Sequence, residues 1–200
     1  MPAAIKPPRV LICAPSNAAI DEIVRRLKVG IYDCYHVKFT PRIVLLGSQD
    51  MIHEEVKDLS IDAVVEKTFI ASCKESLELL KKQKSEVAQL KKDLDFAETD
   101  QRQADKLQDL KKALWSAREN MKKNTVFIEN TRHSLRTKVL NDAQVICTTL
   151  SSSGIELLSK MQFPFVIIDE ACQSVELSAL IPLQYGCQNC VLVGGTINSL

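Results

Sequence analysis

Two adjacent carboxylates follow an apolar run in the last quarter of this 200-residue chain. Residues 163–168 are aromatic or β-branched apart from Pro164, and they end at Asp169 and Glu170. This composition predicts a strand buried on both faces, with the two acids at its C-terminal end. Open parallel sheets bind ligands at that end. One acid there can hold Mg²⁺, and a second can orient or deprotonate an attacking water.

An isolated acidic pair can instead mark a helix N-terminus, where carboxylates favour the positive end of the helix dipole. The longer string at residues 166–173, Val-Ile-Ile-Asp-Glu-Ala-Cys-Gln, resembles the Walker B motif (motif II) of superfamily 1 helicases, in the form found in the senataxin branch. The resemblance implies an ATP-dependent RNA/DNA helicase motor. In that family Asp169 would bind Mg²⁺, Glu170 would be the catalytic base, and Gln173 would contact the nucleotide or the attacking water.

A second apolar run, residues 9–14, is broken by Pro15, Ser16 and Asn17 and is followed by helical spacing over residues 18–28. We expect a buried strand and then a helix capped by Ser16 or Asn17. The string Ala-Pro-Ser-Asn-Ala-Ala-Ile-Asp at residues 14–21 also resembles motif Ia of the same helicases. That loop touches the backbone of a single strand, which makes Ser16 and Asn17 candidate phosphate contacts.

Two further strands are predicted, one at residues 41–47 and one in the first part of residues 141–154, and a helix is predicted over residues 48–56. A hydroxyl-rich loop follows the second strand, and simple turn chemistry explains such a composition. The string Cys-Thr-Thr-Leu-Ser-Ser-Ser at residues 147–153 is also similar to a helicase segment that lies along the nucleic-acid strand. Thr148, Thr149 and Ser151 are therefore candidate phosphate contacts.

Residues 68–138 contain neither Gly nor Pro and carry two heptad seams. The first seam is Val87, Leu90, Leu94 and Ala97, and the second is Leu107, Leu110, Leu114, Ala117 and Met121. The seams are out of register by one residue, with polar residues 98–101 between them, so we predict an antiparallel helical hairpin. Trp115 is expected to pack at its seam. The place of the hairpin in the chain resembles that of the helical projection called the prong in senataxin-like helicases.

The returning arm of this hairpin, residues 102–138, carries 10 Lys and Arg against 4 Asp and Glu. A basic face can bind nucleic acid, but it can equally be a solvated face, and the seams could also bind a partner helix or another copy. These alternatives remain open. Seven cysteines, an odd number with some inside apolar runs, favour reduced thiols over a disulfide framework.

The phosphate-cradling motif G-x-x-G-x-G-K-[ST] is absent from these 200 residues. Residues 190–194 predict another strand, and Gly194 matches the first glycine of helicase motif III. The Asp of that motif is missing, and Asn198 is a doubtful substitute for its Gln. We expect ATP and Mg²⁺ as cofactors by resemblance, with no tight binding and no hydrolysis by this chain alone.

The predicted fold is α/β, a partial RecA-like (P-loop NTPase) parallel sheet with an inserted antiparallel coiled-coil hairpin. The predicted domains are residues 1–66, 67–139 and 140–200. We expect a fragment of a helicase motor that binds single-stranded RNA or DNA. The alternatives are a coiled-coil interaction module and a nucleic-acid-binding protein without catalysis. No signal peptide or membrane span is predicted, and the expected location is the nucleus, with the cytoplasm possible.

Overall fold

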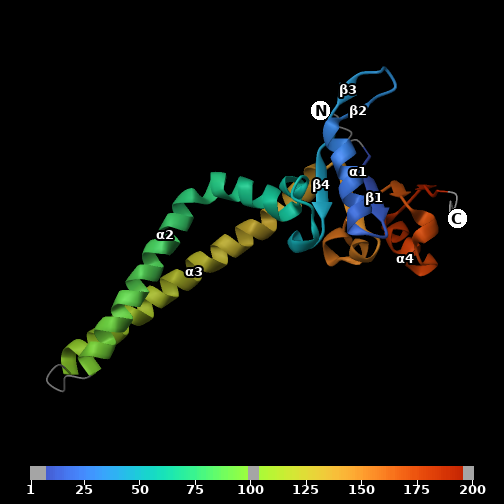
Figure 1. Ribbon diagram of the computed structural model, residues 1–200. Coiled ribbons are helices and arrows are strands. Elements are labelled where there is room, and N and C mark those ends of the chain that lie inside the picture. The colour runs from blue at the N-terminus through green and yellow to red at the C-terminus, as the bar shows by residue number, and fades with distance from the viewer. Residues whose placement is uncertain (1–7, 99–103, 196–200) are drawn as a thin grey trace, which may run out of the picture. The chain divides into compact units, whose positions relative to one another are not determined.

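The computed structural model describes residues 8–98 and 104–195, and these divide into two compact units. The first unit holds a parallel sheet and comes from residues 1–65 and 136–200, and the second is a helical hairpin from residues 66–135. Figure 1 shows both units. Among the described residues, no helix has the length and apolar character needed to cross a bilayer.

The sheet has five strands in the order β4, β5, β1, β6, β7, and every neighbouring pair is parallel. In chain order the strands are β1 (Val10–Ala14), β4 (Ile43–Leu46), β5 (Val145–Thr149), β6 (Phe165–Ile168) and β7 (Asn189–Leu192). The predicted α/β fold, a partial RecA-like sheet interrupted by paired helices, is confirmed. Each apolar run identified in the sequence became one of these strands.

Burial of β1 explains why its run is continuously apolar. Residues 11–14 are all buried, as expected for the central strand of a parallel sheet. Helix α1 (Asn17–Val29) covers one face of the sheet, where Ile20 and Val24 pack against Ile12 and Leu45. The helix therefore leaves the end of β1 and folds back over the strands.

The connection from α1 to β4 contains a small antiparallel ribbon of β2 (Ile31–Tyr32) and β3 (Lys38–Phe39). The helix predicted over residues 48–56 is wrong. The chain instead forms two short 3₁₀ turns, Gln49–Met51 and Lys57–Leu59. Ile52 and Val56 still face the core, so apolar spacing alone could not separate a helix from separate turns.

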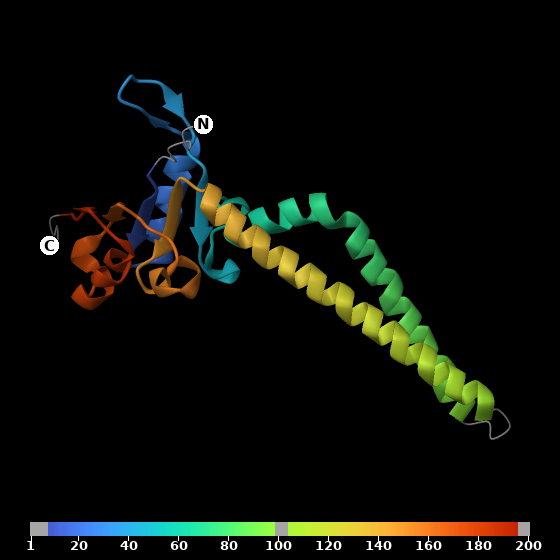
Figure 2. The same cartoon turned by 180° about the vertical axis from the view of Figure 1, so that it is seen from behind.

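Two long helices, α2 (Ile61–Glu98) and α3 (Ala104–Asp142), form the hairpin. Both views show the later part of α2 running beside α3, while the part before it bows away from α3 (Figures 1 and 2). They are antiparallel, because Phe69 packs with Ile128 while Val87, further along α2, packs with Leu114. The cluster at Val87 contains members of both predicted seams, namely Leu90, Leu94, Leu114, Ala117 and Met121. Of the polar residues between the seams, Glu98 is the last residue of α2, and residues 99–101 lie outside the described part of the chain.

Trp115 does not pack at the seam. Its side chain is 71% exposed, although Leu114 beside it is buried. The seam takes residues 114, 117 and 121 of α3, and this spacing turns position 115 outward.

The end of the hairpin nearer residue 66 is held by a second cluster and by polar contacts. Phe69, Cys73 and Ile128 are buried together. The Arg132 guanidinium lies 4.6 Å from the centroid of the Phe69 ring and 3.1 Å from a carboxylate oxygen of Glu66. Helix α2 is irregular at Cys73, where φ is −122° and ψ is 22°.

We predict that Phe69→Ala destabilises the hairpin by about 3 to 5 kcal/mol, because it removes a fully buried aromatic side chain and leaves a cavity. Phe96→Ala, in the same helix, is the matched control. Phe96 is 76% exposed, so its loss should change the free energy of unfolding by less than about 0.5 kcal/mol. Urea denaturation followed by helical circular dichroism measures both, and equal effects would contradict the packing described.

Candidate functional site

The sites predicted from sequence gather at one edge of the sheet, where parallel strands end. The backbone N–H of Asp169 donates to the carbonyl of Cys13 at 2.8 Å. On the other side of β1, the N–H of Leu150 donates to the carbonyl of Ala14 at 2.9 Å. The residues that follow β1, β5 and β6 therefore lie on adjacent strand ends.

The acidic pair has an unusual backbone. Glu170 has φ 51° and ψ 34°, in the left-handed region, and is one of two non-glycine residues with positive φ among those described. Its N–H donates to Oδ1 of Asp169 at 3.0 Å, and its carbonyl accepts from the N–H of Gln173 at 2.9 Å. Such a conformation costs free energy and is concentrated at functional sites. Both acids are half-buried.

Strand β7 continues this edge and brings Gly194 close to the acidic turn. The N–H of Val193 donates to the carbonyl of Ile168, and the N–H of Ala171 donates to the carbonyl of Val193, each at 2.8 Å. A Cβ atom at Gly194 would lie 3.5 Å from Sγ of Cys172. Gln173 is exposed in the same turn. Asn198 lies outside the described residues.

The acidic side chains that follow β6, Asp169 and Glu170, are of the type that can coordinate Mg²⁺. Within the described ranges, no group of three or more His, Cys, Asp or Glu could hold a metal ion. Magnesium is commonly held by one or two carboxylates, with substrate phosphates and waters as its other ligands. Asp169, with Glu170 beside it, meets that requirement.

Ser16 and Asn17 begin α1 at the end of β1. Ser16 is the N-cap, and its Oγ accepts from the N–H of Ala19 at 3.2 Å. Ser16 is exposed and Asn17 is half-buried. The first turn of the 13-residue helix contains no acid, so its N–H groups and its dipole favour a negatively charged ligand.

The three hydroxyls after β5 differ in their surroundings. Ser151 is exposed. Thr149 is 6% exposed, and its Oγ accepts from the N–H of Ser152 and lies 3.2 Å from Oγ of Ser151. Thr148 is fully buried, and its hydroxyl has no hydrogen-bond partner among the described residues. A phosphate cannot reach the Thr148 hydroxyl as the sequence predicted, because this side chain is closed off from the surface.

Tyr185 is a residue of this region that the sequence did not single out. Its hydroxyl donates to the carbonyl of Ser153 at 2.6 Å, and its ring meets Phe163 edge-to-face at 6.0 Å. The N–H of Phe163 donates back to the carbonyl of Tyr185 at 2.9 Å. Tyr185 thus ties the loop after β5 to the segment that enters β6. No local pattern reveals this contact, because its partners are more than twenty residues away.

All seven cysteines are free, as expected for reduced thiols. Burial raises the pKa of Cys13 to about 12, and it also raises the pKa of Cys147. Both thiols lie on the strands that carry the site. They remain protonated near neutral pH and act there as small apolar side chains.

A five-stranded parallel sheet interrupted by a pair of long helices, with an acidic pair at the end of an inner strand, is consistent with a partial RecA-like fold. A family model for the AAA domain matches residues 1–196. Helicase SEN1 of Saccharomyces cerevisiae is 35% identical over 95% of this chain and 10% of its own length. Probable helicase senataxin of Homo sapiens is 28% identical over 96% of this chain and 8% of its own length.

The Regulator of nonsense transcripts 1 homolog of Neurospora crassa is 31% identical over 93% of this chain and 13% of its own length. The chain belongs to the AAA domain family, in the branch of superfamily 1 helicases that includes SEN1 and senataxin. It spans about a tenth of the length of these relatives.

We predict that Glu170→Gly raises the free energy of unfolding by about 0.5 to 1 kcal/mol, because glycine adopts the left-handed conformation without steric cost. Glu176→Gly is the control. Glu176 is in the first turn of α4 (Glu176–Leu180), with ordinary helical geometry, and its replacement should lower stability by up to about 1 kcal/mol. Chemical denaturation distinguishes the opposite signs, and a loss of stability in both variants would show that Glu170 is not strained.

Proposed function

We propose that this chain is the part of an ATP-dependent helicase motor that holds Mg²⁺ and the attacking water. The observation that carries the proposal is the position of Asp169 and Glu170 at the same sheet edge as the loops after β1 and β5. The residues for ATP hydrolysis and those for binding single-stranded nucleic acid then lie at the ends of neighbouring β-strands.

In this proposal Asp169 holds Mg²⁺, and Glu170 orients the attacking water and accepts its proton. Bound ATP would supply the phosphoanhydride, and Mg²⁺ would neutralise its β and γ charges. The hydrogen bond from the Glu170 N–H to Oδ1 of Asp169 orients the Asp169 carboxylate. Gln173 and Gly194, where the turn after β6 meets the end of β7, would contact the bound nucleotide.

Single-stranded RNA or DNA is the proposed partner of the two polar loops. Ser16 and Ser151 are exposed on adjacent strand ends, with Asn17 and Thr149 beside them. Hydroxyls, an amide and free helix N–H groups suit phosphate oxygens, which position a strand without reading its sequence. A location in the nucleus remains a prediction.

We predict salt-sensitive binding of single-stranded RNA by the 200-residue chain, because phosphate contacts release counterions. Ser151→Asp places a negative charge at a phosphate contact and should weaken binding about fivefold at low salt. The matched control is Gln188→Asp, which adds the same charge at the exposed residue preceding β7, at the opposite sheet edge. Fluorescence anisotropy over a salt series measures both. Equal losses in the two variants would remove Ser151 from the interface.

A second prediction concerns ATP. The chain alone should not hydrolyse ATP, because these 200 residues contain no phosphate-cradling loop. A chimera in which residues 8–194 replace the matching segment of yeast SEN1, without residues 195 and 196 where the motif III Asp is missing, should hydrolyse ATP when RNA is added. Glu170→Gln should lower that rate by at least about 100-fold, since it removes the general base. Glu176→Gln, six residues further along the chain, should leave it unchanged.

The chimera also tests the proposal in the opposite direction. A chimera that binds RNA but hydrolyses no ATP would contradict a catalytic role for this segment. ATP turnover by the 200-residue chain itself, abolished in Glu170→Gln, would contradict the need for a phosphate loop from elsewhere.

A second candidate function is binding of single-stranded nucleic acid by the hairpin, without catalysis. Trp115 is exposed, and Lys112, Arg118 and Lys122 are exposed along the same helix. An exposed aromatic among basic residues can stack on a base.

The seam at Val87 is already used within the chain, so a partner helix would have to bind elsewhere on the hairpin, for example at Phe96.

A further inference from the structure

A cavity of about 300 Å³ lies in the sheet unit, beyond the end of β4. Four segments that are distant in sequence surround it: the end of β4, the first turn of α2, the last turns of α3 and the segment after β5. Its apolar wall consists of Leu46, Ile61, Ile155 and Leu157. None of these residues belongs to the acidic turn or to the predicted phosphate contacts.

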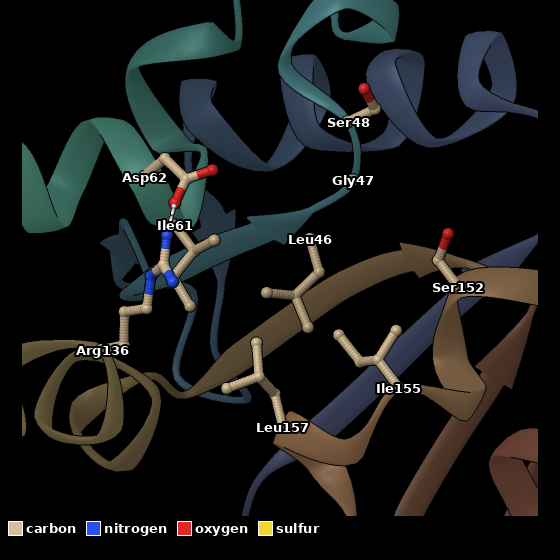
Figure 3. Close-up of a pocket in the computed structure, with 9 residues that line it drawn as sticks. All are labelled: Leu46, Gly47, Ser48, Ile61, Asp62, Arg136, Ser152, Ile155 and Leu157. Atoms are coloured by element: carbon tan, nitrogen blue, oxygen red, sulfur yellow. Dashed lines mark hydrogen bonds and ion pairs between the residues drawn. The ribbon is translucent and has the colours of Figure 1, made fainter. Parts of the chain in front are cut away.

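Polar groups form two opposite sides of this cavity. Figure 3 shows Asp62 and Arg136 on one side, and the hydroxyls of Ser48 and Ser152 on the other, with the apolar side chains between them. Nη2 of Arg136 lies 2.6 Å from Oδ1 of Asp62. Both side chains are partly exposed, at 46% and 34%, so solvent weakens this ion pair and a ligand can share its groups.

The charge of the cavity selects among ligands. A phosphate placed against Arg136 would also meet the carboxylate of Asp62, which repels it. A wholly apolar ligand would cover both charged groups without giving either a hydrogen bond. The cavity therefore suits an uncharged ring with two apolar faces and an edge that carries donors and acceptors.

A nucleobase has this chemistry. Its faces can pack against aliphatic side chains, and its edge can accept from a guanidinium and donate to a carboxylate. The volume is at the lower end of small-molecule sites, which suits a single base. It is too small for an amphipathic helix, whose diameter is about 10 Å.

The cavity is also next to the loop after β5, which we propose binds single-stranded nucleic acid. Ser152 lines it, and Ser151, the exposed candidate phosphate contact, is the preceding residue. The N–H of Ser152 donates to Oγ of Thr149 at 3.2 Å, which fixes the two serines in one turn. A nucleotide whose phosphate contacts Ser151 thus has its base within reach of the cavity.

We propose that this cavity receives one base of the bound single strand, with Arg136 and Asp62 at the edge of the base and Leu46, Ile155 and Leu157 against its faces. The inference rests on the proposed function, because it needs a strand across the loop after β5. It adds a base-holding site to a surface otherwise limited to phosphate contacts. All four bases carry acceptors for Arg136, and their N–H groups can donate to Asp62, so the site tolerates any sequence.

The test uses the full 200-residue chain and a single-stranded RNA of roughly nine nucleotides, within the usual size range of such sites. One abasic nucleotide is moved along the RNA, and the dissociation constant is measured for each position. We expect about tenfold weaker binding when the abasic nucleotide occupies the position held by the cavity. Leu157→Phe, which fills the cavity from its exposed side, should weaken binding of intact RNA to the same extent and abolish the dependence on abasic position.

Leu177→Phe, at an exposed position on α4 outside the cavity, is the matched control and should behave as the unchanged chain. If all RNAs bind with salt dependence but no abasic position matters, the base site is wrong while the proposed strand binding stands. If the abasic pattern persists in Leu157→Phe, the base lies elsewhere and the inference is also wrong. If no RNA binds at any salt concentration, the proposed function itself fails.

Discussion

The parallel pairing of β1 with β5 on one side and β6 on the other is the constraint on which the structure depends. The backbone carbonyls of Cys13 and Ala14 accept hydrogen bonds from the N–H groups of Asp169 and Leu150. These bonds fix the start of the acidic turn (residues 169–173) and of the serine loop (residues 150–154). Residues 11–14 are buried on both faces of the sheet, so a one-residue shift of β1 would send each side chain to the opposite face and disrupt its packing there. Burial of an apolar strand therefore determines where polar groups meet.

The sheet edge carries strain that the rest of the unit must offset. A left-handed glutamate costs of order 1–3 kcal/mol. Hydrogen bonds from Ala171 to β7 and from Glu170 to Asp169 hold that turn between strands with buried neighbours. The serine loop is held in another way, by Tyr185, whose hydroxyl reaches the Ser153 carbonyl. Rigid support beneath polar loops is what phosphate and metal chemistry at a strand end requires.

Local patterns predicted the elements whose periodicity is strong. The strand runs, the heptad seams and the acidic pair all follow from side-chain spacing along a few turns or residues. The helix predicted over residues 48–56 was wrong, because apolar spacing that suits a helix also suits two short turns with buried Ile52 and Val56. The predicted packing of Trp115 was wrong, because a shift of one residue along a helix turns a side chain from the seam toward solvent. The burial of Thr148 was not predictable, since the residues that cover it come from other segments.

The sequence by itself determined which segments become the five strands of the parallel sheet, though not the short β2–β3 ribbon. It also determined that the long polar stretch folds as a hairpin and that two acids end a buried strand. These depend on neighbours within about one turn or one strand of each residue. Tertiary structure alone decided that three loops share one edge, that Glu170 is left-handed, and that Leu46, Asp62, Arg136 and Ile155 enclose one cavity. Those features arise when strands far apart in the chain pair, and no local spacing records which side chains will then meet.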